Sequence, residues 1–260
     1  MYPGSPIEAG STDEAAVRKI QTRLKALGVD PALEVDGDFG PSTEAAVKLF
    51  QARALDPNGD LLLIDGVVGP TTWAALFGEK IEKVKVAGGA LLEAVIAQAK
   101  SQVGKMENPL GSNRGPEVDE YLKRAGLDPK KGSYAWCAAF VYWCFDEAAK
   151  EIGKTNPAPK TAGVLEMWRQ AGAKSLKRYT PGQARANPAL VKPGQLFFLD
   201  TGSGTGHVGV IIGVEGMVLT TVEGNTTEIT GSREGIGVFK RKARRIGAVN
   251  LGFADFSQTI

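Results

Sequence analysis

Residues 206–214 read GHVGVIIGV, and this stretch decides the fold of the second half of the chain. Its apolar residues recur with the period of a β-strand, which sets Val208 and Val210 on one face and His207 on the other. The apolar face must be covered by other parts of the chain. His207 is the only histidine in 260 residues. Any mechanism with a histidine base must therefore use it, and a zinc site built on two or three histidines is excluded.

Residues 91–257 follow a pattern of helices first and strands afterwards. Helical periodicity marks residues 91–103, 118–122, 137–141 and 164–171. The period then changes to two at residues 196–199, 207–214, 217–223 and 237–239. This order predicts an α+β domain with an antiparallel sheet.

The first part of the chain contains an internal repeat. Residues 36–43 read DGDFGPST and match residues 65–72, DGVVGPTT, at an offset of 29. In each copy the glycines permit a tight turn, and proline followed by serine or threonine begins a helix. An earlier helix begins at the capping-box pattern Ser11–Glu14 and ends at Gly28. Residues 11–78 are thus predicted to form a small three-helix domain.

Charge and composition separate the two parts. Residues 11–78 hold 6 Lys and Arg against 10 Asp and Glu, a net charge of −4, whereas residues 79–260 hold 25 against 18, a net charge of +7. Residues 79–90 are charged and then glycine-containing, which is typical of a linker. The basic cluster at residues 240–245 is interpreted as a solvated face.

The overall composition is that of an ordinary globular protein, with 43% apolar and 23% charged residues. No apolar run approaches the ~20 residues of a membrane span. The first residues show no basic segment followed by an apolar one, so we expect no secretory signal and delivery by another system.

The strand after His207 decides which side chain faces the histidine. Glu223 and Asn225 share one face of that strand. Pairing position 213 with 217 sets Glu223 opposite His207, and pairing 214 with 218 sets Asn225 there. A two-residue loop would turn both away from it. We therefore predict a three-residue turn, or a bulge, around residues 215–216, and a pocket kept open by Gly209.

Cys137 is the candidate nucleophile because it begins the apolar helical stretch. The dipole and free amides of a helix N-terminus favour a thiolate, and a nearby imidazolium favours it further. The same amides can hold a developing oxyanion. Cys144 would lie ~10.5 Å further along the helix axis, beyond the ~7 Å limit of a disulfide. We interpret it as a buried apolar thiol.

These residues together suit attack on an amide carbonyl. Cys137 would act as the nucleophile and His207 as the base and then the acid. Glu223 or Asn225 would orient the imidazole.

Two family resemblances follow from these motifs. The doubled DGxxGPxT signature resembles the peptidoglycan-binding domain family, a three-helix module found beside cell-wall hydrolases, over residues 11–78. This resemblance implies binding of wall glycan. On the alternative interpretation the turns only shape the fold, and we expect this of most of their residues.

The second resemblance is to CHAP domains, the cysteine- and histidine-dependent amidohydrolases/peptidases of papain-like fold. It covers residues 91–257 and rests on YAWCAAFV at 134–141, PGQLFF at 193–198, GHVGVI at 206–211 and VEGNT at 222–226. It implies Cys137 as nucleophile, His207 as base and Glu223 as acidic orienter, and Asn225 matches a nearby polar residue. Some CHAP domains carry a calcium loop of closely spaced aspartates before the cysteine. No such loop precedes Cys137, so we expect no calcium, no other metal and no cofactor.

The expected function is hydrolysis of an amide bond in peptidoglycan, either N-acetylmuramoyl-L-alanine or a stem-peptide bond. The domain order resembles phage endolysins, held in the host cytoplasm until they are released to the periplasm or cell wall. An injected antibacterial effector would use the same chemistry. The rival hypotheses are a muramidase with paired carboxylates, a wall-binding protein without activity and a cysteine acyltransferase. The expected partner is bacterial peptidoglycan, with no nucleic acid, no integral membrane contact and a monomeric state.

Overall fold

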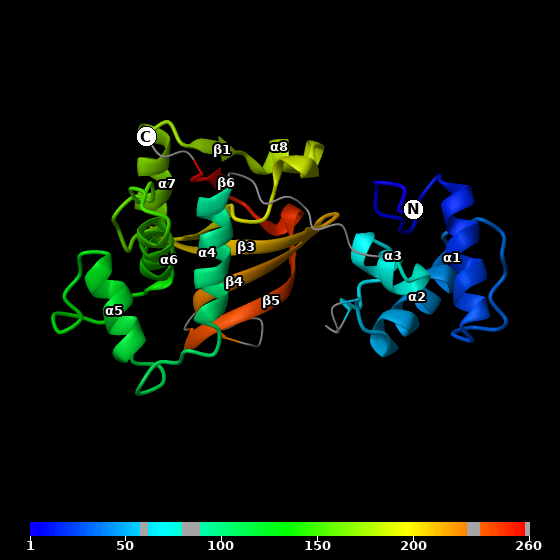
Figure 1. Cartoon of the computed structure of the whole chain (residues 1–260), viewed down its shortest axis with the longest axis horizontal. Coiled ribbons are helices and arrows are strands. Elements are labelled where there is room, and N and C mark those ends of the chain that lie inside the picture. The colour runs from blue at the N-terminus through cyan, green and yellow to red at the C-terminus, as the bar shows by residue number, and fades with distance from the viewer. Residues whose placement is uncertain (58–61, 80–88, 228–234, 258–260) are drawn as a thin grey trace. The chain divides into compact units, whose positions relative to one another are not determined.

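The computed structural model describes residues 1–57, 62–79, 89–227 and 235–257. The chain divides into two compact units, Met1–Lys83 and Val84–Ile260 (Figure 1). Residues 80–88 of the predicted linker lie outside the described residues. In the part of the chain that is described, no helix is long and apolar enough to cross a membrane.

The N-terminal unit contains three helices, α1 (Glu14–Ala26), α2 (Pro41–Arg53) and α3 (Pro70–Phe77). The Asp13 side chain caps α1 by accepting a hydrogen bond from the backbone N–H of Ala16. The two repeated signatures begin α2 and α3 with proline in the first turn, where its missing N–H costs nothing. The predicted three-helix domain is confirmed.

A buried glutamine holds each of the repeated turns. Gln21 is 1% exposed, and its Nε2 donates to Asp36 Oδ1 at 2.7 Å and to the Asp38 carbonyl at 3.0 Å. Its Oε1 accepts from the backbone N–H of Gly37 at 2.9 Å. Gly37 has a φ of +81°, which a side chain would strain. The polar groups of this turn are thus satisfied from inside the domain.

Gln51 repeats this arrangement in the second turn. Its Nε2 donates to Asp65 Oδ1 at 3.0 Å and to the Val67 carbonyl at 2.9 Å, and its Oε1 accepts from the Gly66 N–H at 2.9 Å. The two turns are therefore built alike. Their aspartates and glycines shape the fold, as expected for most of the signature.

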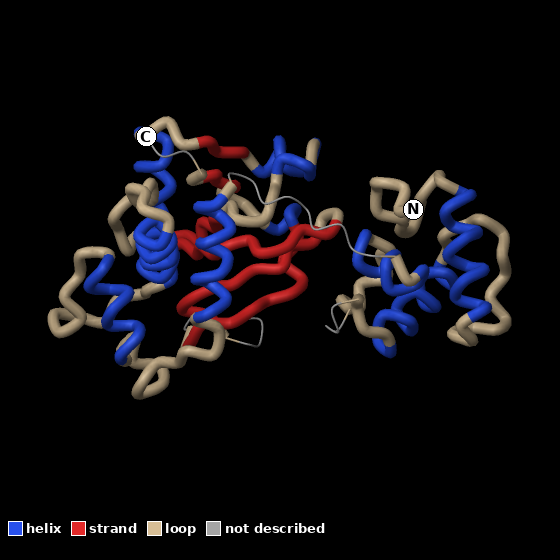
Figure 2. Tube along the Cα trace, in the orientation of Figure 1, coloured by secondary structure: helices blue, strands red, loops and turns tan. Residues whose placement is uncertain are grey.

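The C-terminal unit places helices before and over an antiparallel sheet, so the predicted α+β class is confirmed (Figure 2). Its main helices are α4 (Ala90–Ser101), α5 (Pro116–Arg124), α6 (Cys137–Glu151), α7 (Val164–Ala173) and α8 (Pro181–Ala186). Its strands are β1 (Lys177–Tyr179), β2 (Leu196–Gly202), β3 (Thr205–Glu215), β4 (Val218–Thr226), β5 (Gly237–Arg245) and β6 (Gly252–Asp255). The sheet order is β1-β6-β2-β3-β4-β5.

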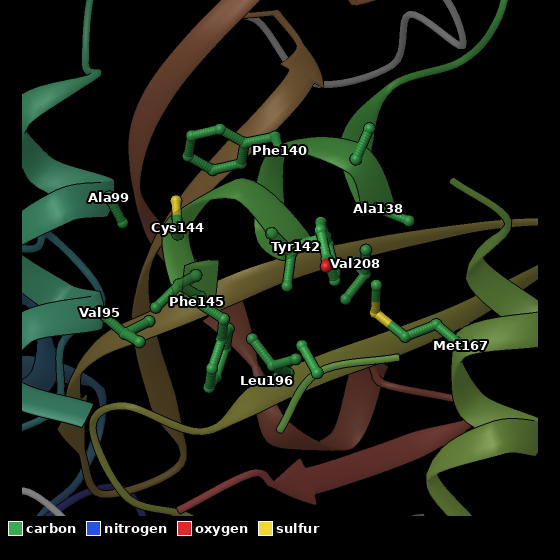
Figure 3. Packing of buried hydrophobic residues seen from close by; sticks show 14 of the residues in the cluster. Val95, Ala99, Ala138, Phe140, Tyr142, Cys144, Phe145, Met167, Leu196 and Val208 are labelled. Carbon is green, nitrogen blue, oxygen red and sulfur yellow. The ribbon is translucent and has the colours of Figure 1, made fainter. Parts of the chain in front are cut away.

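Both faces of the sheet carry buried residues. On one face Val208, Val210 and Val222 pack with α4 and α6 in the main apolar cluster, which also contains Cys144 (Figure 3). On the other face Phe197 and Ile211 belong to a second cluster, with residues from α8 and from around β6. The expectation of one apolar face was therefore incomplete, because the face that carries His207 is also covered at Gly209 and Ile211.

The β3–β4 hairpin differs from the predicted one. Glu215 pairs with Val218, so the loop has two residues, and Gly216 takes the positive φ of +56° that such a tight loop needs. The register then shifts by one residue between Ile211 and Gly213. The bulge is thus at Ile212 rather than around residues 215–216. A two-residue loop alone would have turned Glu223 and Asn225 to the face opposite His207, and the bulge returns them to the face of His207.

The glutamine-held turns can be tested by Gln21→Ala. The substitution leaves the buried polar groups of the first turn without partners, so we expect the N-terminal unit to lose about 2–4 kcal/mol of unfolding free energy. Differential scanning calorimetry of the full chain measures the loss as a lower temperature for the unfolding transition of the N-terminal unit. Lys19→Ala, an exposed change on the same helix, should leave that transition in place. Equal transitions for both variants would contradict the assignment.

Candidate active site

Cys137 is the first residue of α6, directly after the N-cap residue Trp136. No side chain caps this helix, so its first amides stay available to a bound group. Cys137 is 2% exposed, and its Sγ lies 4.0 Å from the carbonyl oxygen of Gly206, the neighbour of His207. This contact spans 69 residues of sequence and brings the nucleophile candidate next to the histidine.

A buried carboxylate holds the segment that precedes α6. Glu107 is 3% exposed, and its Oε1 accepts a hydrogen bond from Trp136 Nε1 at 2.8 Å. Its other oxygen accepts from the backbone N–H of Asn113 at 3.0 Å. Asn113 in turn donates from Nδ2 to Ser133 Oγ at 3.1 Å. The segment between α4 and α5 therefore braces the residues that precede Cys137.

His207 and Glu223 form a direct pair between β3 and β4. Nε2 of His207 lies 2.7 Å from Oε2 of Glu223. The imidazole is 18% exposed and the carboxylate has no exposed surface. Since Nε2 is engaged by the carboxylate, Nδ1 is the ring nitrogen left for Cys137. The pair lies on the face of β3 that also carries Gly209.

Gly209 leaves the space in which this pair fits. A Cβ at this position would lie 2.7 Å from the ring of Phe197 and 2.8 Å from Cγ of Glu223. No side chain can occupy that position without moving one of them. The predicted opening at Gly209 is filled by the carboxylate and the phenyl ring.

The Glu223 carboxylate is held by two further residues. Thr221 Oγ1 donates to its Oε1 at 2.6 Å. Arg244 donates from Nε to Oε1 at 3.1 Å and from Nη2 to Oε2 at 2.8 Å. This is a bidentate, charge-assisted arrangement. The interpretation of residues 240–245 as a solvated face is therefore wrong for Arg244.

These contacts shift the pKa of both members of the pair. Burial alone would lower the pKa of His207, but hydrogen bonds and charge from Cys137 and Glu223 outweigh it and raise the pKa from 6.5 to about 9. Burial alone would raise the pKa of Glu223, but His207 and Arg244 outweigh it and hold that pKa well below its usual range. The pair is an imidazolium beside a carboxylate at neutral pH.

Asn225, the other predicted orienter, is placed differently. It has a φ of +53° at an irregularity in the pairing of β4 with β5, and its Oδ1 is buried without a hydrogen-bond partner. The residue bonded to His207 is Glu223. Of the four predicted site residues, the structure thus brings three into contact, while Asn225 lies two positions along the same strand.

Comparisons with known proteins find two family matches along the chain. Residues 13–76 match the family model of a putative peptidoglycan binding domain, and residues 129–225 match that of the CHAP domain. The chain joins a peptidoglycan-binding domain to a CHAP domain. The CHAP match contains all four predicted site residues, whereas Arg244 lies beyond it.

Curated relatives match only part of the chain. The zinc D-Ala-D-Ala carboxypeptidase of Streptomyces albus G is 38% identical over 72 residues, which are 27% of this chain and 26% of that protein. An uncharacterized protein in the bpoA1 3′ region of Kitasatospora aureofaciens is 40% identical over 70 residues, 26% of this chain and 50% of that protein. The chain therefore spans a quarter to a half of the length of these relatives. No solved structure matches.

The sequence patterns missed two residues that support the candidate site, Glu107 and Arg244. Glu107 lies 29 residues before its partner Trp136, and no local pattern connects them. Arg244 was hidden among five basic residues of one run. A signal existed for Arg244, since a buried glutamate needs a cation and the following strand carries several. Among the described residues, no group of three or more His, Cys, Asp and Glu side chains can hold a metal ion.

The raised pKa of His207 can be measured directly. Because the chain has one histidine, its imidazole signals in an NMR titration need no assignment. We expect a midpoint near pH 9 in the native protein and a lower one in Glu223→Gln, since the carboxylate stabilises the imidazolium. Exposed Glu93→Gln should keep the native midpoint.

The raised pKa of His207 also makes the stability of the fold depend on pH. The folded-state pKa lies above the ordinary value, so the pair stabilises the fold fully below about pH 6.5, and this contribution is lost as the pH rises through about 9. A native midpoint near 6.5, unaffected by Glu223→Gln, would contradict the pairing.

Proposed function

We propose that the protein hydrolyses an amide bond of peptidoglycan with Cys137 as nucleophile and His207 as acid and base. The observation that carries this proposal is the contact of Cys137, at the uncapped start of α6, with an imidazole that a buried carboxylate holds in place. The two domain matches support a peptidoglycan hydrolase as the class of protein. The scissile bond is N-acetylmuramoyl-L-alanine or a bond of the stem peptide.

In the first step the thiolate sulfur of Cys137 attacks the amide carbonyl carbon and forms an S–C bond. An imidazolium beside the sulfur favours the thiolate before attack. The tetrahedral intermediate collapses as the C–N bond breaks, and His207 gives its proton to the departing amine. The products of this step are a free amine and a thioester on Cys137.

In the second step water attacks the thioester carbonyl. His207, now neutral, takes a proton from that water, the S–C bond breaks, and the acid product leaves with the thiolate restored. Glu223 holds Nε2 through both steps, so Nδ1 stays directed at the sulfur and the reacting atoms. The first amides of α6 are suited to hold the oxyanion that forms in each step.

The peptidoglycan-binding domain would tether the enzyme to its polymer and raise the local substrate concentration. As the biological setting we propose a phage endolysin, made in the host cytoplasm and reaching the wall through a membrane lesion made by another protein. The domain order supports this setting. An effector injected into rival cells would use the same chemistry, and we propose that the enzyme acts as a monomer.

The cysteine mechanism is tested on purified sacculi. We expect Cys137→Ala to lose at least about 10³-fold of the fragment release, because no other group can form the thioester. Cys144→Ala is the matched control, since Cys144 is fully buried in the apolar cluster and its burial raises the pKa of its thiol. It should retain nearly full activity. Mass spectrometry of the fragments names the bond.

The products separate the rival hypotheses. Free lactyl groups with intact stem peptides indicate an amidase, and shortened stems indicate an endopeptidase. New reducing sugar from an equally active Cys137→Ala would mean a muramidase and would overturn the proposal. Binding to sacculi without any release would mean a wall-binding protein, and a larger product that carries an added amine would mean an acyltransferase.

The tethering role predicts a difference between polymeric and soluble substrates. A chain that begins at Val84 should need a higher enzyme concentration to clear sacculi, by about 10-fold or more, because the second binding event is lost. On soluble fragments it should match the full chain, which also shows that the shortened protein is folded. Equal activity on sacculi would show that the N-terminal domain is no tether for this substrate.

A further inference from the structure

Arg244 has contacts that set it apart from the rest of the basic run. Its guanidinium donates two hydrogen bonds to Glu223 and lies over the ring of Phe197, with Cζ 4.3 Å from the ring centroid. Its side chain is only 17% exposed. Arg245, the next residue, is exposed at the surface of the same strand. We propose that Arg244 is a positioning residue of the active site, which fixes the Glu223 carboxylate against His207.

An irregularity in the sheet places Arg244 where it can do this. Thr221 pairs with Arg241 and Thr220 with Lys242, but Leu219 pairs with Arg244. One extra residue of β5 therefore lies between the last two pairs. In a regular ladder residue 244 would lie on the opposite face from Glu223, because paired residues share a face and successive residues alternate. The bulge turns Arg244 to the face of the catalytic pair.

The contacts across Gly209 complete the arrangement. Phe197 on β2 and Arg244 on β5 are separated by β3 and β4. Position 209 on β3 carries no side chain, and a Cβ there would lie against both the Phe197 ring and Cγ of Glu223. A guanidinium stacked on an aromatic ring and bonded twice to a carboxylate has little freedom to move. Glu223 is thereby held by Arg244 as well as by His207, and both of them contact its Oε2.

The need for this cation follows from the proton transfers of the proposed mechanism, on which this inference rests. Glu223 has no exposed surface, so its negative charge must be compensated within the protein. His207 compensates it only while protonated, and it becomes neutral when it gives its proton to the leaving amine. Arg244 remains charged throughout. It therefore keeps Glu223 ionised at the stage when the imidazole must act as a base.

The groups that face the pair are few. His207 is contacted by Cys137 of α6 and Glu223 of β4, and its ring lies beside Phe197 of β2. Glu223 is contacted by His207 of β3, Thr221 of its own strand and Arg244 of β5. Among these contacts Arg244 supplies the one permanent positive charge. Its loss should thus change the pH range in which the pair works.

The first test compares Arg244→Gln with Arg245→Gln. The first readout is kcat and KM on soluble peptidoglycan fragments. The second is the pH dependence of alkylation of Cys137 by iodoacetamide, which mass spectrometry follows. The fully buried Cys144 is the reference thiol that should stay unmodified in the folded protein. We expect Arg244→Gln to lower kcat by about 10–100-fold with little change in KM, which is the usual size of a supporting-residue effect. The acid limb of alkylation should move to higher pH, because Glu223 then protonates more easily.

Arg245→Gln should behave as the native protein in both measurements. If Arg244→Gln also gives the native kcat and the native alkylation profile, the inference is overturned. Alkylation needs no peptidoglycan. A shifted alkylation profile in a protein that fails to cleave sacculi would therefore support the role of Arg244 while contradicting the proposed function.

The second test asks whether Arg244 acts through Glu223. A double-mutant cycle of Arg244→Gln and Glu223→Gln should be non-additive, with little further loss of kcat once the carboxylate is gone. Additive losses would overturn the inference. Arg244→Lys covers the case in which the glutamine variant does not fold. It retains the charge but not the two parallel hydrogen bonds, so we expect an intermediate kcat, and native kcat would contradict bidentate positioning.

Discussion

A carboxylate with no exposed surface must find its charge compensation and hydrogen bonds inside the protein, and Glu223 is in that position. It obtains them from His207 on β3, Thr221 on its own strand and Arg244 on β5. One side chain therefore constrains the register of three adjacent strands. A shift of either neighbouring strand by one residue would turn its partner to the other face of the sheet and leave a buried charge uncompensated. The need to bury this ion favours a single pairing among the several that the apolar residues alone would allow.

Two irregularities in the ladder serve the same purpose. The bulge at Ile212 lets a two-residue loop coexist with a histidine and a glutamate on one face, and the extra residue of β5 brings Arg244 to that face. A strand of strict period two offers each face only alternate residues. Local breaks in the period are thus the means by which a sheet with two buried faces gathers three polar side chains at one point. Gly209 leaves the space that Glu223 and the ring of Phe197 occupy.

Sequence patterns predicted the elements in which apolar residues recur with a regular period. The three N-terminal helices, the doubled turn, the helices α4 to α7 and the strands β2 to β4 follow from periodicity and from helix start and stop residues, whereas α8 and the second half of β5 were not predicted. Alternation also identified Glu223 and Asn225 as the residues that share the face of His207. Alternation could not choose between them, and neither could the register, because Val210 pairs with Val222 in the register expected to set Asn225 opposite His207, whereas the bonded residue is Glu223. The short strands β1 and β6 contain three and four residues, too few for a period to emerge. Arg244 and Glu107 were missed because their partners are set by tertiary contacts between distant segments.

The repeated signature of the N-terminal domain deserves a different interpretation from the site motifs. Its aspartates, glycines and threonines are bonded to two buried glutamines within the domain, so their polar groups are already satisfied. These residues of the signature therefore stabilise the two turns and the helices that follow them. Cys137 and His207, both within the CHAP match, differ from these turn residues. Their contacts raise the pKa of the imidazole and place it beside a thiol. The repeated turns of the first domain thus have a structural role, whereas Cys137 and His207 of the second domain are placed for chemistry.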